Sequence, residues 1–233
     1  CRAPTMQAPT GWYGKLPILG DFTRRHLPPA FIDPWDDWLQ AGIAGSRAAL
    51  GGAWLDNYLT AHVWHFVLMP GVLGPQAWAG VWSPSVDRVG RYFPFTLAAP
   101  LAPGGTPAAV GEWLGGLEDI ARLGLQLETD ITPLDDALER LGPPPGDAHC
   151  TLPLQGLAER LARRDEAISL PCAGPLQPGG ALQALATASL LTQLAGYSVW
   201  WCFDAERRSG GVAHRNLPDA SFMVKMITYS PTD

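Results

Sequence analysis

The sequence SPSVDRVGRYFPFTL, residues 83–97, joins two apolar segments and gathers charge, glycine and aromatic residues between them. Two apolar runs predict two buried strands: residues 77–82, which lead into this stretch, and residues 95–99, which overlap its end. The charged part is therefore predicted to be a connection between antiparallel strands, and connections of this kind often carry function. Pro84 and Gly90 mark its two ends.

This connection contains one carboxylate, Asp87, and two guanidinium groups, Arg88 and Arg91, within five positions. Two interpretations are open. In the first, Asp87 pairs with an arginine and only fixes a hairpin, as ion pairs in turns commonly do. In the second, these charges recognise a partner or a ligand together with Tyr92, because Arg and Tyr dominate protein–protein contacts.

A second polar segment, GWYGKLPILGDFTRRH, occupies residues 11–26. Gly20 and Asp21 predict a turn, because Gly adopts positive φ and Asp caps neighbouring backbone groups. The functional interpretation is that Asp21 and Arg24 face the 87–91 connection. Two distant segments would then form one polar patch.

Length, composition and charge limit the fold classes and partners that this chain can have. A chain of 233 residues with 47% hydrophobic residues and ten tryptophans is long and apolar enough for one well-buried α/β domain. A net charge of −6 without a basic cluster argues against nucleic acid as a partner. The four cysteines form no metal-ligand or redox spacing, so neither a metal nor a cofactor is expected.

The localisation is predicted from two sequence patterns that we looked for, a signal peptide and a membrane span. The sequence shows no signal-peptide pattern, and its apolar runs end well before the length that spans a bilayer. We therefore expect a cytoplasmic protein without direct membrane insertion. Residues 1–10 are expected to form a flexible tail, residues 11–233 a single domain, and residues 143–180 an irregular, Pro- and Gly-rich part of it.

Hydrophobic periodicity predicts an α/β layered domain with a mixed, largely antiparallel sheet flanked by helices. The predicted strands are residues 63–69, 77–82, 95–99 and 198–203, with the first three as neighbours. The predicted helices are one that starts at Asp33 and stops at Gly51, and others over residues 53–60, 110–121, 132–141, 155–164 and 182–193. Residues 222–227 have helical spacing but β-favouring residues, so both helix and strand stay open for them.

Three local details are predicted with these elements. Asp33 is expected to cap the first helix, with Pro34 at its first position. Thr132 is expected to open the 132–141 helix with a capping-type box. In the 53–60 helix, the inward residues are expected to be Trp54, Leu55, Tyr58 and Leu59. His65 is expected in the core or at its rim, because on a strand it lies on the opposite face from His62 and the two cannot share a metal.

The two segments quoted above resemble the TagF family, also called ImpM, of bacterial type VI secretion accessory proteins. The resemblance is carried by residues 11–26 and 81–101, in the order and at the distance that the family shows. It implies structural roles for the matching Gly and Pro positions and recognition by the charged ones. The structural positions are Gly14, Pro17, Gly20, Pro84, Gly90 and Pro94, and the charged positions that match the family are Asp21, Asp87 and Arg91. Beside the resemblance, we hypothesise a partner-binding patch formed by Asp21, Arg24, Asp87, Arg88, Arg91 and Tyr92.

The resemblance also implies a function. TagF-like proteins act as posttranslational repressors of the secretion apparatus, by binding its forkhead-associated scaffold protein (Fha) or components at its membrane base. The expected protein is therefore a non-enzymatic regulator. The alternative is a small-ligand-binding or hydrolytic protein that uses a pocket formed by Asp21, Asp87, Arg88 and Arg91. A purely structural subunit of the apparatus is a third possibility.

Overall fold

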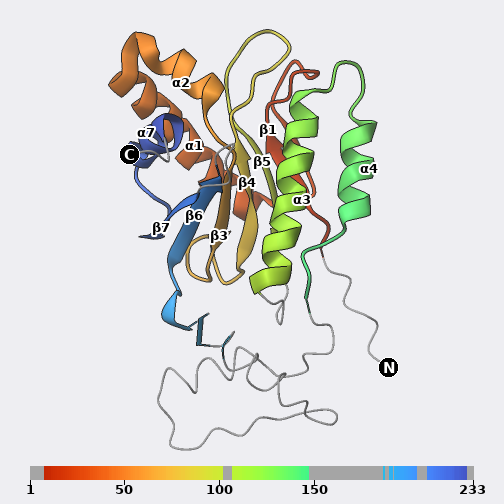
Figure 1. Cartoon of the computed structure of the whole chain (residues 1–233), viewed down its shortest axis with the longest axis vertical. Coiled ribbons are helices and arrows are strands. Elements are labelled where there is room, and N and C mark those ends of the chain that lie inside the picture. The colour runs from red at the N-terminus through yellow and green to blue at the C-terminus, as the bar shows by residue number, and fades with distance from the viewer. Residues whose placement is uncertain are drawn as a thin grey trace, which may run out of the picture.

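The computed structural model describes residues 8–101, 107–146, 186, 189–190, 192–203 and 209–229. Their strands form one seven-stranded sheet in the order β2-β1-β5-β4-β3-β6-β7, and each neighbouring pair is antiparallel (Figure 1). The bounds are β1 Gly11–Gly14, β2 Thr23–Arg25, β3 Trp64–Leu68, β4 Trp78–Ser83, β5 Phe95–Pro100, β6 Tyr197–Phe203 and β7 Ser209–Arg215.

Helices cover both faces of the sheet (Figure 1). One face carries α1 (Pro29–Leu50), the short 3-10 turn η1 (Gly51–Ala53), α2 (Trp54–Thr60) and α7 (Ala220–Thr228). The other carries α3 (Pro107–Leu125) and α4 (Thr132–Leu141). The predicted α/β layered domain with a largely antiparallel sheet is confirmed, as are the four predicted strands and the adjacency of the first three.

The interior strand β3 is largely apolar on both faces because each face meets a different hydrophobic cluster. Trp64, Phe66 and Leu68 belong to the cluster under α1 and α7. The stripe of aromatic residues on α1 fills the same cluster: Trp35 lies with its ring centroid 4.7 Å from that of Phe66, and its Nε1 donates to Thr96 Oγ1 at 3.0 Å. The tryptophans of α1 are thus core residues, as their helical spacing predicts.

His65 points to the opposite face, where it is buried beside α3. Its Nε2 lies 3.2 Å from Glu118 Oε2, and its ring stacks on Trp201 at 5.5 Å. Burial of Glu118 opposes its ionisation, but hydrogen bonds from His65 and Arg122 outweigh burial and lower the pKa of Glu118 to about 2. The predicted placement of His65 in the core is confirmed.

The start of α1 corrects the sequence prediction. The helix begins at Pro29, so Asp33 is not its cap and Pro34 lies inside it. The buried side chains of Phe31 and Ile32 extend the helix towards its N-terminus, because packing outweighs a local capping signal. The predicted stop at Gly51 is confirmed, and this residue has a φ of 53°.

Two other helix details were predicted wrongly. In α2, Leu55 and Leu59 are 36% and 55% exposed, because this short helix turns only Trp54 and Tyr58 into the core. Thr132 is the first residue of α4 rather than its cap, and its backbone N–H donates to Asp130 Oδ1 at 3.1 Å.

Two edge strands were not predicted. Strand β2 directly follows the turn predicted at Gly20 and Asp21, and no strand was predicted over β7. Thr10, placed in the tail by composition, is buried. The predicted helix 155–164, most of the helix 182–193 and most of the irregular region lie outside the described residues. No helix in the described ranges combines the length and apolar character needed to cross a bilayer.

Candidate functional site: two interlocked loops

Two loops that are far apart in sequence meet at one end of the sheet (Figure 1). The first loop, residues 15–22, joins β1 to β2, and the second loop, residues 84–94, joins β4 to β5. Because β1 pairs with β5, the two loops leave the sheet side by side. The backbone N–H of Arg88 donates to Leu19 O at 3.0 Å, and Ser85 Oγ donates to Lys15 O at 2.6 Å.

The first loop begins at a close approach between strands. Gly14 has a φ of 129°, and a Cβ at this position would lie 2.0 Å from Pro94 O, so a side chain cannot be accommodated there. A turn follows in which Leu19 N donates to Leu16 O at 3.0 Å and Pro17 takes the second position, which its fixed φ suits. The sequence signature thus encodes the path of the backbone.

The second loop is a small hairpin closed by hydrogen bonds across it. Asp87 N donates to Arg91 O at 3.1 Å, and Phe93 N donates to Ser85 O at 3.1 Å. At its tip, Gly90 N donates to Asp87 O at 3.0 Å, and Gly90 has a φ of 82°. This left-handed conformation favours glycine and gives Gly90 a structural role.

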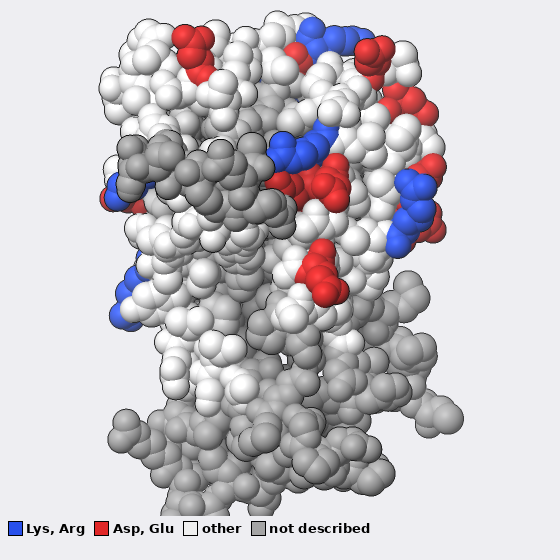
Figure 2. All heavy atoms as spheres, viewed as in Figure 1, with Lys and Arg blue, Asp and Glu red and all other residues white. Residues whose placement is uncertain are grey.

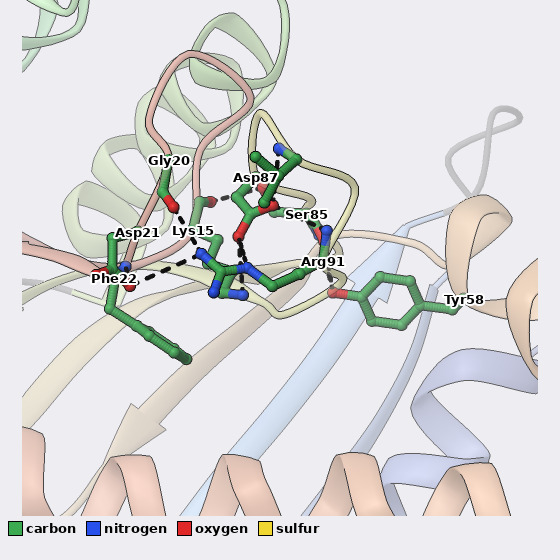
Figure 3. A network of polar contacts seen from close by, with 9 residues as sticks. Lys15, Gly20, Asp21, Phe22, Tyr58, Ser85, Asp87 and Arg91 are labelled. Carbon is green, nitrogen blue, oxygen red and sulfur yellow. Dashed lines mark hydrogen bonds and ion pairs between the residues drawn. The ribbon is translucent and has the colours of Figure 1, made fainter.

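The Asp87 side chain is the centre of the site (Figure 3). It is fully buried, and its carboxylate receives four donors from both loops. Oδ1 accepts the backbone N–H groups of Val89 at 3.1 Å and Arg91 at 2.8 Å. Oδ2 accepts Arg91 Nε at 2.7 Å and lies 3.0 Å from Lys15 Nζ. Asp87 therefore ties the two loops together.

Electrostatics show that this carboxylate is held in its charged form. Burial opposes ionisation of Asp87, but the hydrogen bonds from Arg91 and Lys15 and the charge of Lys15 outweigh it, so the pKa of Asp87 lies well below its usual range. A carboxylate with all its acceptor positions in use is a poor general base. Its chemistry is that of an internal ion pair.

Arg91 completes the connection between the loops. Its Nη2 donates to Gly20 O at 2.6 Å and lies 3.8 Å from Asp21 Oδ1 (Figure 3). Because the Asp21 carboxylate is exposed, this longer contact with Arg91 contributes little to the stability of the fold. Arg91 is half exposed, but its guanidinium is already committed to both loops.

A buried hydroxyl anchors the second loop to α2. Tyr58 Oη accepts Ser85 N at 2.9 Å and donates to Ser85 O at 3.0 Å. Tyr58 is fully buried, and burial raises its pKa above the usual value. Sequence reasoning missed Tyr58, Ser85 and Lys15 as members of this network. One sequence feature could have identified Lys15: it is a single charged residue between the apolar strand β1 and the buried Leu16.

We define the exposed tip of the two loops by Phe22, Arg88 and Val89; the side chains of Asp21 and Arg91 in these loops are exposed as well. Phe22 is 47% exposed and Val89 is 65% exposed. The ring of Phe22 lies edge-on to Phe93 at 4.7 Å, and Lys15 Nζ lies 4.8 Å from its centroid. Arg88 is exposed, and within the described residues no carboxylate lies within 4.0 Å of its guanidinium.

The structure does not bring all the predicted site residues together. Asp21, Asp87, Arg88 and Arg91 meet in the two loops, but Asp87 is inaccessible. Arg24 lies on β2 opposite Tyr13, and no hydrogen bond or ion pair of the described chain joins it to the second loop. Tyr92 turns away towards Trp54 and Tyr58, with ring centroids at 6.2 and 6.1 Å.

Charge is dispersed over the surface. Figure 2 shows acidic and basic side chains intermixed on a mostly uncharged face, with no broad field of one sign. Within the described part of the chain, no group of three or more His, Cys, Asp or Glu residues is placed to hold a metal ion. The exposed side chains of the two loops are of mixed polarity, with Phe22 and Val89 apolar and Arg88 charged.

The family described as "TagF N-terminal domain, Type VI secretion system-associated" matches residues 11–141, more than half of the chain. The chain belongs to the TagF family. The matched span runs from β1 to the end of α4 and includes both interlocked loops. The family resemblance predicted from the two sequence signatures is thereby confirmed, and this TagF family member is associated with type VI secretion.

A crystal structure of PA0076 from Pseudomonas aeruginosa PAO1, at 2.05 Å resolution, is similar to this TagF family member. The two share 34% sequence identity with a TM-score of 0.71, over 95% of this chain and 94% of that chain. The similarity therefore extends past residue 141 into the part that supplies β6, β7 and α7. No curated protein matches the chain.

Proposed function

We propose that this chain is a non-enzymatic, posttranslational repressor of a type VI secretion system. It acts in the cytoplasm by binding the forkhead-associated scaffold protein of that system, or a component at the membrane base, and withholding it from assembly. The family membership supports the association with the secretion system. The partner and the repression are the proposal.

The observation that carries the proposal is the exposed tip formed by Phe22, Arg88 and Val89. A half-exposed aromatic ring, and an exposed arginine without a carboxylate partner among the described residues, are each typical of anchors in protein interfaces. The tip stands on the buried Asp87 ion pairs, so its shape is fixed before binding. A fixed surface loses little conformational entropy on association.

The arrangement of the charged residues favours binding over catalysis. Asp87 is buried and fully hydrogen-bonded, and the Arg91 guanidinium bridges the loops. What is left for a partner is the exposed carboxylate of Asp21, the guanidinium of Arg88 and two apolar side chains. These can contact a protein surface, and within the described part of the chain the single carboxylate has no nucleophile hydrogen-bonded to it that it could activate.

The test is capture of the forkhead-associated protein of the same gene cluster by the purified chain. Wild type should capture it, and Arg88→Glu and Phe22→Ser should lose capture by at least about tenfold while their melting temperatures stay unchanged. The matched control is Arg140→Glu, a charge reversal at another exposed arginine in the last turn of α4. Capture by folded Arg88→Glu and Phe22→Ser at the wild-type level would refute the docking surface.

A further inference from the structure

A hollow on the α1–α2 side adjoins the second loop. It has a volume of about 320 Å³ and is open to solvent. Its walls come from the end of α1, the η1 turn, the start of α2 and the second loop; the lining residues are Arg47, Gly51, Gly52, Trp54, Leu55 and Tyr92. A Cβ built on either glycine would meet nothing within 4 Å, so this side of the hollow is open space.

Apolar groups line the hollow. The indole of Trp54 is almost fully buried and is fixed by a 2.9 Å hydrogen bond from its Nε1 to Ser46 Oγ. Tyr92 lies edge-on to this indole, and Leu55 is the partly exposed leucine that α2 turns away from the core. Because Trp54 is almost fully buried, an apolar side chain entering the hollow would bury area mainly against Leu55 and Tyr92, with the edge of the indole at its floor.

A cation lies at the rim of this apolar surface. The Arg47 guanidinium lies 4.2 Å from the centroid of the Trp54 ring. Arg47 is exposed, and no carboxylate of the described residues lies within 4.0 Å of it. A guanidinium held over an indole keeps its N–H edge free, and that edge matches a carboxylate with two parallel hydrogen bonds.

From this complementarity we propose that the hollow receives a segment of the protein partner in which a large apolar side chain adjoins an Asp or Glu. The apolar side chain fills the space between Trp54, Leu55 and Tyr92, and the carboxylate pairs with Arg47. The inference rests on the proposed function, because Tyr92 places the hollow beside the same loop that carries the docking tip. It adds the chemistry of the partner: an acidic, apolar peptide.

The probe is the peptide acetyl-Gly-Phe-Asp-Gly-amide, compared with its Asn counterpart, which has the same shape without the charge. Binding is followed by NMR on the backbone amides of Gly51 and Gly52 and on the Trp54 indole N–H. The Asp peptide should give saturable shifts confined to these signals, with an affinity about tenfold higher than that of the Asn peptide. Equal affinities, or no saturable shift up to the solubility limit, would overturn the proposal.

Variants separate the guanidinium from the rest of the hollow. Arg47→Gln should abolish the preference for the Asp peptide, and Arg47→Lys should lose most of it because an ammonium lacks the planar fork. The matched control, Arg140→Gln, should keep the preference. A preference that persists in folded Arg47→Gln would overturn the role of Arg47. Self-association of the chain that Arg47→Gln removes would show a second copy as the occupant and would overturn the choice of partner.

The peptide test and the capture test fail independently. If wild type binds the Asp peptide but captures no forkhead-associated protein, the assignment of that partner fails and the hollow's specificity stands. If wild type captures the partner but does not bind the peptide, the hollow is overturned and the docking tip stands. If both hold, Arg47→Gln should weaken capture as well.

Discussion

Removing the buried carboxylate of Asp87 is predicted to destabilise the protein strongly. In Asp87→Ala, the Lys15 ammonium, only 5% exposed, would lose its carboxylate partner, and the backbone N–H groups of Val89 and Arg91 would lose their acceptor. Breaking a buried ion pair by removing one partner costs about 3–5 kcal/mol. We expect a loss of this size in the free energy of unfolding, measured by urea titration with circular dichroism and tryptophan fluorescence.

The second variant tests the cause of that loss. Lys15→Met removes the cation while Asp87 keeps Arg91 and two backbone donors, so it should cost only about 1 kcal/mol. The double variant Lys15→Met/Asp87→Ala should be more stable than Asp87→Ala alone, because no buried ammonium is left without a partner. The control is Asp21→Asn, which should change the free energy of unfolding by less than about 0.5 kcal/mol because the carboxylate is exposed.

The same reasoning gives the pH dependence. Folding lowers the pKa of Asp87, so its stabilisation is complete above the ordinary value of 3.8 and is lost as the pH falls below it. Asp87→Ala should lack this part of the acid-induced loss. A double variant as unstable as the sum of the two single variants, or an Asp87→Ala protein within about 1 kcal/mol of wild type, would refute the ion-pair account.

Three further predictions concern the parts around the loops. Tyr58→Phe leaves the buried N–H of Ser85 without an acceptor and should cost about 1–3 kcal/mol in urea unfolding, whereas a change below about 0.5 kcal/mol would show that another acceptor replaces the hydroxyl. Glu118→Gln should reduce the loss of stability between pH 4.5 and about 2 by the part due to Glu118, because folding lowers the pKa of Glu118 across that window; an unchanged pH profile by thermal melting would contradict this. Gly14→Ala should lower the melting temperature by several degrees, since the new Cβ would overlap the Pro94 carbonyl; a melting temperature equal to wild type would show that β1 shifts freely.

Much of the fold could be predicted because the decisive signals are local. The apolar residues on both faces of β3 predict an interior strand, and the regular hydrophobic spacing of α3 predicts a helix. The start of α1 could not be predicted, because Phe31 and Ile32 are helical only through burial against the sheet. Strand β7 was missed because its residues, SGGVAHR, resemble a loop until β6 pairs with them.

The candidate site was predicted in part. The two signatures correctly placed Asp21 and Arg91 near each other across 70 positions. Which charges are accessible could not be read from the sequence, because exposure depends on Lys15, which approaches Asp87 only in the fold. The internal ion pair is present, because Asp87 and Arg91 lock the loops, while Arg88 and Phe22 face outward. Recognition of a partner by these outward residues stays a prediction.

The pairing of β3 with β6 has a consequence for any shortened version of this protein. The family match ends at residue 141, yet all five residues of β3 pair with residues 198–202. A fragment that stops at residue 141 would leave the backbone of β3 as an open edge and uncover the aromatic rings that pack on Trp200. An apolar strand with an unpaired edge recruits other strands, so such a fragment would aggregate rather than behave as an independent module.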